Sequence, residues 1–416
     1  MRTVNAKARA MRGSFAILAA SVMLGFATSA VAQVAQSDYA AGYVVLPKVV
    51  VHTTGGTPPV LLGGVTTDTL IQITNINQAE SINVHCWWVN ANKHCATPTG
   101  AICETNADCV AQEAPLPCQQ DWGVTNFEFT LTPGQPIGFL ASEGLNPIPC
   151  SSGTCIGLAS GAVLAVPEDP FRGELKCLQV SDSDEPVDQN DLKVEATIVS
   201  HDSDSDPAVT TAAAYNGVGF RSVDVGSQAA TDPICLGSAP SEAPGCAGNY
   251  APCPNVLHLE HFFENANTGL GSFATTELTL VPCSEDLGDP AASEAFSVTA
   301  QMLVYNEFEQ RFSTSASVQC YKSVRLSDID TQPGVSNDQF SIFAVGVQGT
   351  IVGQTRIKGV SNGGGRLGFG IIGVANENHS ATVGGTVVST AAFNLQHVGF
   401  RQTGDAVYRT LPGNVP

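Results

Sequence analysis

Glycine and proline divide this chain into short segments in which apolar and polar residues alternate. There are 41 Gly and 24 Pro among 416 residues, and no window of a dozen residues shows a clear apolar stripe at the helical period of 3.6. Alternation is clearest in NFEFTLTPGQ at 126–135 and DLKVEATIVS at 191–200. It places apolar side chains on one face of each strand, at Phe127, Phe129 and Leu131 and at Leu192, Val194, Ala196 and Ile198. The pattern predicts an all-β fold of sandwiches or barrels.

One phrase occurs twice, which indicates a duplication. TAAAYNGVGFR at 211–221 returns as TAAFNLQHVGFR at 390–401. Three earlier segments recur in the same order: TLIQI at 69–73 as TELTL at 276–280, SINVHCWWVN at 81–90 as SVTAQMLVYN at 297–306, and RGELKCLQVSDSD at 172–184 as RLGFGIIGVANEN at 366–378. A duplication repeats several strands in one order. We therefore predict two tandem, related β-sandwich domains stapled by disulfides, at 33–231 and 254–416, joined by a Pro/Gly/Cys linker at 232–253.

The first 32 residues have the pattern of a secretory signal peptide. Four basic residues precede an apolar stretch at 14–27, and Ala30-Val31-Ala32 fits the A-x-A cleavage pattern. That stretch is shorter than the ~18 apolar residues of a membrane helix, and no later run approaches that length. We expect the mature chain to begin near Gln33 and to be secreted, periplasmic or extracellular, without membrane insertion.

The expected mature chain is strongly acidic. Cleavage removes four of the 18 Lys and Arg residues and none of the 38 Asp and Glu residues, so 14 basic residues remain against 38 acidic ones, a net charge of −24. This charge excludes nucleic acid as a natural partner, because phosphate binding requires a basic surface. Acidity of this degree favours solubility and cation binding and does not determine the fold.

All thirteen cysteines lie between Cys86 and Cys320. Cysteines of exported proteins pair in the oxidising compartment, and the absence of any C-x-x-C motif argues against structural zinc and haem attachment. The odd number predicts six disulfides and one cysteine outside them. The cysteines at 95, 103, 109 and 118 predict a stapled loop that has too little core to fold by itself.

Several motifs of the first half resemble a group of uncharacterised secreted bacterial β-rich proteins. These motifs are TDTLIQITN at 67–75, NVHCWWVNANKHC at 83–95, GELKCLQV at 173–180 and YNGVGF at 215–220. The resemblance extends from Thr67 to about Phe220, and the second half departs from the pattern except in its final phrase. It implies export and membership of that group, and it implies no activity, cofactor or catalytic residue.

Two acidic loops of the first half are candidate calcium sites. SDSDEPVDQND at 181–191 and SHDSDSDP at 200–207 contribute seven carboxylates: Asp182, Asp184, Asp188, Asp191, Asp202, Asp204 and Asp206. The second loop alternates as an EF-hand does, but Pro207 stands where that loop needs glycine and no glutamate closes it, which excludes an EF-hand. Clustered carboxylates in irregular loops can still bind calcium, although Ser/Asp runs are more often solvated loops.

Other candidate residues lack the structural context that their chemistry needs. GVSNG at 359–363 fits G-x-S-x-G, but the residues after it indicate loop and strand rather than helix, which argues against Ser361 as a nucleophile. His258 and His261 would share a face only in a helix, and their surroundings favour a strand. The adjacent Trp87 and Trp88 predict one buried and one half-exposed ring rather than a sugar-binding platform.

Two classes of function remain. A non-enzymatic module for binding, adhesion or assembly fits duplicated sandwiches and stapled loops, with an extracellular polysaccharide, a cell-surface protein or a second copy as its partner. The alternative is an extracellular hydrolase whose site the sequence does not reveal, because function is carried by sites rather than folds. The module is favoured, with no catalytic residue and no cofactor beyond the candidate calcium.

Overall fold

The chain is all-β, as the alternation predicts. The structure is a computed structural model, and it describes residues 35–53, 65–96, 100–104, 106–109, 117–120, 123–145, 158, 160–203, 208–222, 236, 250–269, 271–283, 297–331, 340–361 and 370–399. The expected signal peptide and most of the linker at 232–253 lie outside these residues. No described helix has the length and apolar character to cross a membrane. The helical elements named among the described residues are η1 (Asn106–Cys109), η2 (Leu326–Asp328) and α1 (Val345–Gln348).

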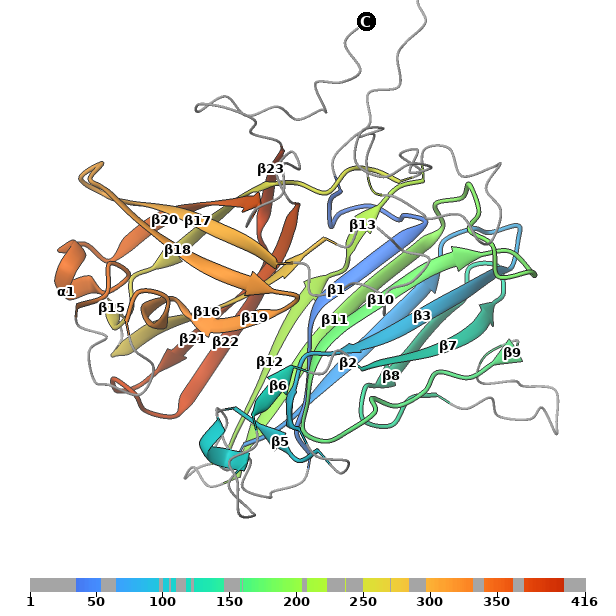
Figure 1. Cartoon of the computed structure of the whole chain (residues 1–416), viewed down its shortest axis with the longest axis horizontal. Coiled ribbons are helices and arrows are strands. Elements are labelled where there is room, and N and C mark those ends of the chain that lie inside the picture. Colours follow the sequence, from blue (N-terminus) through green and yellow to red (C-terminus); the bar gives the residue numbers. More distant parts are fainter. Residues whose placement is uncertain are drawn as a thin grey trace, which may run out of the picture. The chain divides into compact units, whose positions relative to one another are not determined.

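Two antiparallel sheets are built from the first half of the chain (Figure 1). Sheet I has the order β13-β1-β10-β3-β7-β9, and its strands are β1 (Tyr43–Val51), β3 (Ile82–Asn90), β7 (Val124–Leu131), β9 (Ser160–Gly161), β10 (Phe171–Val180) and β13 (Val218–Phe220). Sheet II has the order β12-β11-β2-β8, and its strands are β2 (Val65–Asn75), β8 (Pro136–Leu140), β11 (Leu192–Asp202) and β12 (Val209–Asn216).

The inner faces of sheets I and II share one hydrophobic core. Trp88, Phe129 and Cys86 of sheet I are buried together with Ile71 and Val194 of sheet II. The seven apolar side chains assigned from the alternation of 126–135 and 191–200 are all buried. Period-2 patterning therefore identified the core faces of β7 and β11 correctly.

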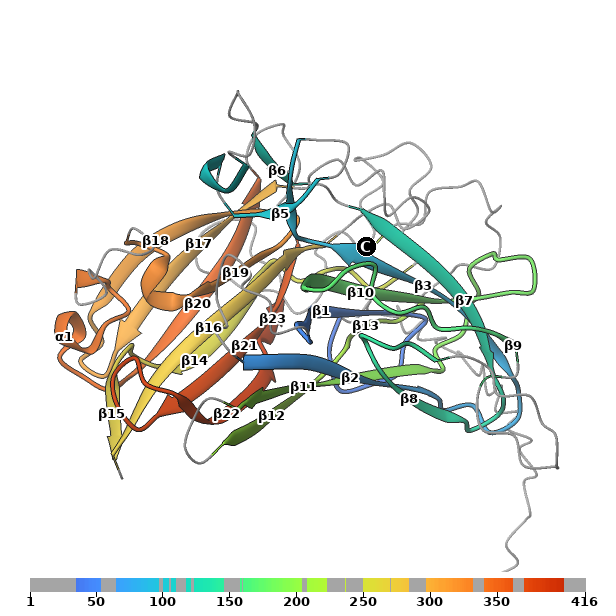
Figure 2. The same cartoon turned by 90° about the horizontal axis from the view of Figure 1, so that it is seen from below.

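The second half forms two further sheets (Figure 2). Sheet III has the order β18-β17-β20-β14-β23, and its strands are β14 (Val256–Phe262), β17 (Ser297–Asn306), β18 (Arg311–Gln319), β20 (Val352–Ser361) and β23 (Gln396–Gly399). Sheet IV joins β15 (Ala266–Gly269), β16 (Ser272–Pro282), β21 (Ile371–Ser380) and β22 (Val387–Asn394), with β19 (Lys322–Arg325) paired to β16. Met302 and Ile357 of sheet III pack with Leu278, Leu280 and Ala375 of sheet IV.

The sheets of the two halves have the same strand order. In sheet I, β13-β1-β10-β3-β7 corresponds to β23-β14-β20-β17-β18 in sheet III, and β12-β11-β2-β8 in sheet II corresponds to β22-β21-β16-β19 in sheet IV. Three of the four aligned segment pairs occupy corresponding strands. The pairing of 172–184 with 366–378 was wrong, because 172–184 contains β10, which corresponds to β20, whereas 366–378 contains much of β21. The duplication and its domain boundaries stay predictions.

The outer face of sheet I is also buried along β1 and β10 and at Trp87 of β3. Tyr43, Val45 and Trp87 pack there against Val281 and Ile372 from the second half. Trp87 is only 8% exposed, so the half-exposed ring expected from the sequence was wrong. The physical reason is that a second set of side chains covers this face.

Polar contacts also join the halves. Lys48 Nζ lies 2.8 Å from Glu277 Oε2; burial raises the pKa of Glu277, but the ammonium of Lys48 and the hydroxyl of Ser323 outweigh it and hold that pKa below its ordinary value. The edge strands β12 and β22 lie side by side. There, Asn394 Nδ2 donates to the Asn216 carbonyl over 2.7 Å, and Asn216 N donates to Asn394 Oδ1 over 3.0 Å.

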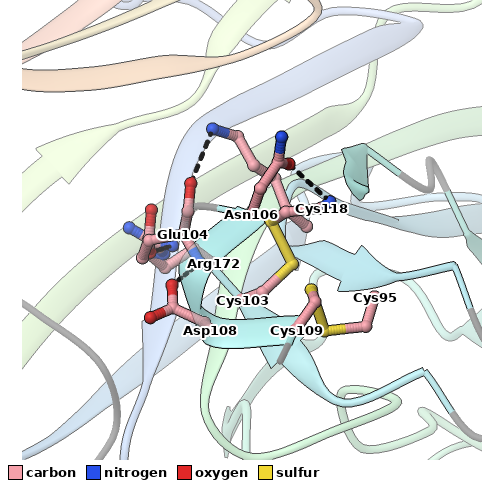
Figure 3. The surroundings of a disulfide bond; sticks show 9 residues. Cys95, Cys103, Glu104, Asn106, Asp108, Cys109, Cys118 and Arg172 are labelled. Carbon is pink, nitrogen blue, oxygen red and sulfur yellow. Dashed lines mark hydrogen bonds and ion pairs between the residues drawn. A yellow bond between two sulfur atoms is a disulfide. The ribbon is translucent and has the colours of Figure 1, made fainter. Parts of the chain in front are cut away.

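Four disulfides lie among the described residues: Cys86–Cys177, Cys95–Cys109, Cys103–Cys118 and Cys253–Cys283. Two of them staple a small cap made of η1, β4 (Lys93–Cys95), β5 (Ile102–Cys103) and β6 (Cys118–Gln120). Figure 3 shows these two bonds together with Arg172 of β10, which contacts Glu104 of the cap. The stapled loop is therefore confirmed, and the total of six disulfides stays a prediction.

Replacing Cys86 and Cys177 together by alanine should lower the free energy of unfolding by about 2–5 kcal/mol. The bond joins residues 91 positions apart and lies in the core shared by sheets I and II. Urea denaturation followed by tryptophan fluorescence measures the change. The control is the Cys95→Ala/Cys109→Ala pair in the cap, which should leave the main transition within ~1 kcal/mol because its sulfurs lie outside that core. An unchanged midpoint for the first variant would contradict the role assigned to the bond.

Glu174 should make stability depend on pH. It is 2% exposed, and burial raises its pKa to about 7 against the opposing effect of Lys176, whose Nζ lies 3.8 Å away. The folded state therefore binds the proton more tightly than the unfolded chain, whose glutamate pKa is ~4.3. The stabilising contribution is complete below that value and is lost as the pH rises through about 7.

We expect the free energy of unfolding of the wild type, relative to Glu174→Gln, to fall by roughly 3 kcal/mol between pH 5 and pH 8. Urea denaturation at several pH values measures this difference. Glu195→Gln, which alters an exposed carboxylate of β11, should give a profile parallel to that of the wild type. Coincident pH profiles for the wild type and Glu174→Gln would rule out the proposed titration.

Candidate functional site

The carboxylates of the first acidic loop have separate partners. Each one lies within hydrogen-bond distance of a different side chain: Asp182 of Asn83 Nδ2 (2.8 Å), Asp184 of His85 Nδ1 (2.8 Å), Asp188 of Ser222 Oγ (2.8 Å) and Asp191 of Asn77 Nδ2 (3.2 Å). These four residues therefore do not form one cluster. Among the described residues, Asp184 is the one of these four that belongs to a group of three side chains able to hold a metal ion, together with His85 and Glu128.

The second acidic loop lies at the opposite end of β11. Asp191 directly precedes this strand and Asp202 ends it, so a rise of about 3.3 Å per residue separates the two ends by roughly 33 Å. Asp204 and Asp206 lie outside the described residues. A single ion therefore cannot be shared by the two loops, and calcium binding at either loop stays a prediction.

The histidines of β14 and the serine of GVSNG lie in strands. His261 is 4% exposed, with Nε2 2.8 Å from Thr355 Oγ1, and burial lowers its pKa to about 4. His258 lies on the opposite face, with Nε2 2.6 Å from Gln354 Oε1. Ser361 is the last residue of β20. The strand interpretation of His258 and His261 is confirmed, whereas Ser361, expected in a loop, is the end of a strand.

A groove of about 590 Å³ lies on the outer face of sheet III. Its lining comes from four adjacent strands: Val256 of β14, Gln301, Met302 and Leu303 of β17, Ser313, Thr314 and Ser315 of β18, and Arg356 and Lys358 of β20. Lys358 pairs with both Gln301 and Val256, and Gln301 pairs with Ser315. Paired residues of neighbouring strands point to the same face, so these side chains form one row across the sheet.

The alternation of β17, β18 and β20 gives this face its polar character. Met302 and Ile357 point into the core, whereas Gln301, Ser313, Ser315 and Arg356 are exposed. Arg356 has no ion-pair partner among the residues the structure describes. Two basic residues therefore stand side by side on one strand of a chain with 38 acidic and 18 basic residues.

A second polar arrangement lies on sheet IV. Ser272 Oγ is 2.8 Å from His379 Nδ1, and His379 Nε2 is 2.8 Å from Glu377 Oε1. Glu377 and His379 lie on one face of β21, and Ser272 opens β16 directly after the turn that follows β15. His379 is held against the ring of Phe262. A serine, a histidine and a carboxylate in such a chain are the groups of a nucleophile, its base and the residue that orients the base.

Neither arrangement was identified from the sequence. In QTRIK at 354–358, Gln354, Arg356 and Lys358 alternate with buried residues, so the period-2 test could have identified the basic face. Ser272 and His379 are 107 residues apart, and only the pairing of β16 with β21 brings them together. No local pattern in the sequence could have found that contact.

Comparison with known proteins gives little further guidance. No protein-family model matches this chain, and neither does any curated protein. A weak match among solved structures is the CupB6 tip adhesin from Pseudomonas aeruginosa, with 11% identity over 88% of this chain and 98% of that chain and a TM-score of 0.12. At this TM-score the likeness supports no conclusion about fold or function.

Proposed function

We propose that this chain is a secreted, non-enzymatic binding module whose sheet III groove binds an acidic extracellular polysaccharide. The observation that carries the proposal is the placement of Arg356 and Lys358 beside Gln301, Ser313 and Ser315 in one groove. The volume of the groove falls within the range of about 300–1,000 Å³ that is usual for ligand sites. An exported protein would meet such a ligand outside the cell. The disulfides are compatible with that location.

The residue types of the groove match a sugar that carries a carboxylate. A guanidinium such as that of Arg356 binds a carboxylate through two parallel hydrogen bonds, and an ammonium adds a point charge. The Gln301 amide and the Ser313 and Ser315 hydroxyls both donate and accept hydrogen bonds, as binding to sugar hydroxyls requires. The groove therefore offers both charge recognition and hydroxyl recognition.

The groove is built on strands rather than loops. Its lining residues belong to β14, β17, β18 and β20, which are hydrogen-bonded to one another in register. A surface fixed in this way loses little conformational entropy when a ligand binds. A repeating polymer can run across such a row of strands with neighbouring units contacting equivalent positions.

The lining fits a polysaccharide better than a protein partner or nucleic acid. Protein interfaces are anchored by buried aromatic and arginine residues, and no aromatic residue lines the described groove. Nucleic acid would be repelled by the negative charge of the chain, which is −20 for the full sequence and −24 after the expected cleavage.

Arg356→Ala should weaken binding to polygalacturonate about 10- to 100-fold, because a charge-assisted hydrogen bond contributes roughly 1.5–3 kcal/mol. Isothermal titration calorimetry with the mature chain measures the affinity, and neutral dextran is the control polymer. Lys358→Ala should act in the same direction with a smaller effect, since lysine binds as a point charge.

Arg311→Ala is the matched control variant. Arg311 is an exposed residue of β18 that is not among the residues lining the groove, so its loss removes one positive charge from the same sheet. We expect it to change affinity less than threefold. An equal loss of affinity for Arg311→Ala and Arg356→Ala would reduce the interaction to general charge attraction, and no binding by the wild type would refute the proposal.

The chain of Ser272, His379 and Glu377 supports a second candidate function, that of an extracellular hydrolase. An ester is the substrate class that suits it, because a serine nucleophile with a histidine base forms an acyl-enzyme most readily from an activated acyl group. The Ser272–His379 and His379–Glu377 distances are both 2.8 Å.

Ser272→Ala should abolish hydrolysis of p-nitrophenyl acetate if this candidate is correct, with a loss of at least 100-fold in kcat/KM. Ser361→Ala is the control serine variant and should retain full activity. If the wild type and both variants hydrolyse the ester equally well, the activity lies at another site. If the wild type does not hydrolyse it, the hydrolase candidate is refuted.

A further inference from the structure

We propose that His85, Glu128 and Asp184 form a binding site for a zinc-like divalent metal ion, which fastens the loop at 181–191 to the outer face of sheet I. His85 lies on β3 directly opposite Glu128 on β7. Asp184 belongs to the loop that follows β10. The three residues each offer one ligand atom, and these atoms all lie within 4.8 Å of one another.

The distances centre on one nitrogen atom. His85 Nδ1 lies 2.8 Å from Asp184 Oδ1 and 3.6 Å from Glu128 Oε1. His85 Nε2 is buried without a hydrogen-bond partner among the described residues, so Nδ1 is the atom that faces both carboxylates. With a metal ion bound among the three groups, His85 Nδ1 and Asp184 Oδ1 would each coordinate the ion in place of their direct contact.

The ligand types select the class of metal. Zinc binds imidazole nitrogen and carboxylate oxygen at about 2.0–2.2 Å, commonly with three protein ligands and one water. Calcium takes six to eight oxygen ligands, whereas this group offers one nitrogen and two carboxylates. The proposed site therefore differs from the calcium site expected from the seven aspartates. Of those seven residues it contains Asp184 alone, and its ligands include a histidine nitrogen.

The surroundings hold both sides of the site in place. The His85 ring is stacked on Trp87, with ring centres 4.1 Å apart and planes 18° apart. The loop is held by the Asn83–Asp182 hydrogen bond of 2.8 Å and by Ser181 Oγ, which accepts hydrogen bonds from the backbone N–H of Ser183 and of Glu185.

Charge also favours a cation here. The Glu128 and Asp184 side chains are 61% and 46% exposed, which leaves the site open to an ion from solvent. Two carboxylates beside one imidazole carry a net negative charge that a divalent cation neutralises. The other group of metal-ligating residues, Cys95, Cys103 and Cys109, has its sulfurs in disulfides and offers no thiolate.

The test uses the mature chain without a histidine tag, freed of metal with a chelator and then titrated with Zn²⁺ or Co²⁺. We expect one ion per chain, a rise in Tm of several degrees at a hundredfold excess over Kd, and quenching of tryptophan fluorescence by Co²⁺ because Trp87 is stacked on His85. His85→Gln and Asp184→Asn should each weaken Zn²⁺ binding at least tenfold.

Asp182→Asn is the matched control, because it removes the same charge from the same loop at a residue whose side chain contacts Asn83 instead of the site. It should bind Zn²⁺ with the affinity of the wild type. Circular dichroism checks that each variant is folded; if His85→Gln is not folded, the exposed Asp184→Asn decides the outcome. Equal affinity in Asp184→Asn and the wild type, equal losses in Asp182→Asn and Asp184→Asn, or a rise in Tm with Ca²⁺ and not with Zn²⁺ would overturn the proposal.

Discussion

Burial of the central strands β1 and β10 of sheet I on both faces is the constraint on which the rest of the structure depends. Its inner face packs on sheet II, and its outer face packs on Val281 and Ile372 of sheet IV. Sheet IV therefore has sheet III on one side and the first half of the chain on the other. These contacts leave the outer face of sheet III exposed, and that face carries the basic groove with Arg356 and Lys358.

The shared strand order gives the two halves equivalent positions with different chemistry. The gapless match of 81–90 with 297–306 places His85 at the position of Gln301, and β7 and β18 both pair with the strands that carry these residues. Glu128 lies opposite His85, and Ser315 lies opposite Gln301. One half therefore presents metal-ligating groups at this position, and the other presents amide and hydroxyl groups next to Lys358. The two halves thus share a strand order and differ in the side chains that they present at this position.

The sequence predicted the features that arise from local pattern. Alternation identified the buried faces at Phe127 and Val194, and cysteine spacing identified the stapled cap. The residues around Trp87 do not themselves reveal its burial, because the contacts come from Val281 and Ile372, 194 and 285 positions later in the chain. The continuous apolar run YVVLPKVVV of β1 was a usable signal, since strands buried on both faces lose their alternation. The grouping of Ser272 with His379, and of His85 with Glu128 and Asp184, depends on strand register, which spacing along the chain does not contain.

The claim that binding takes place on the outer face of sheet III is tested most directly by side-chain footprinting with hydroxyl radicals, with and without polygalacturonate. Leu303 of β17 and Arg356 of β20 face the groove and report on its protection. The account predicts that oxidation of peptides from β17 and β20 falls when the polymer is present, while peptides from β2, β7 and β11 are oxidised at unchanged rates. Protection confined to the first half, or the absence of any protection at saturating polymer, would contradict it.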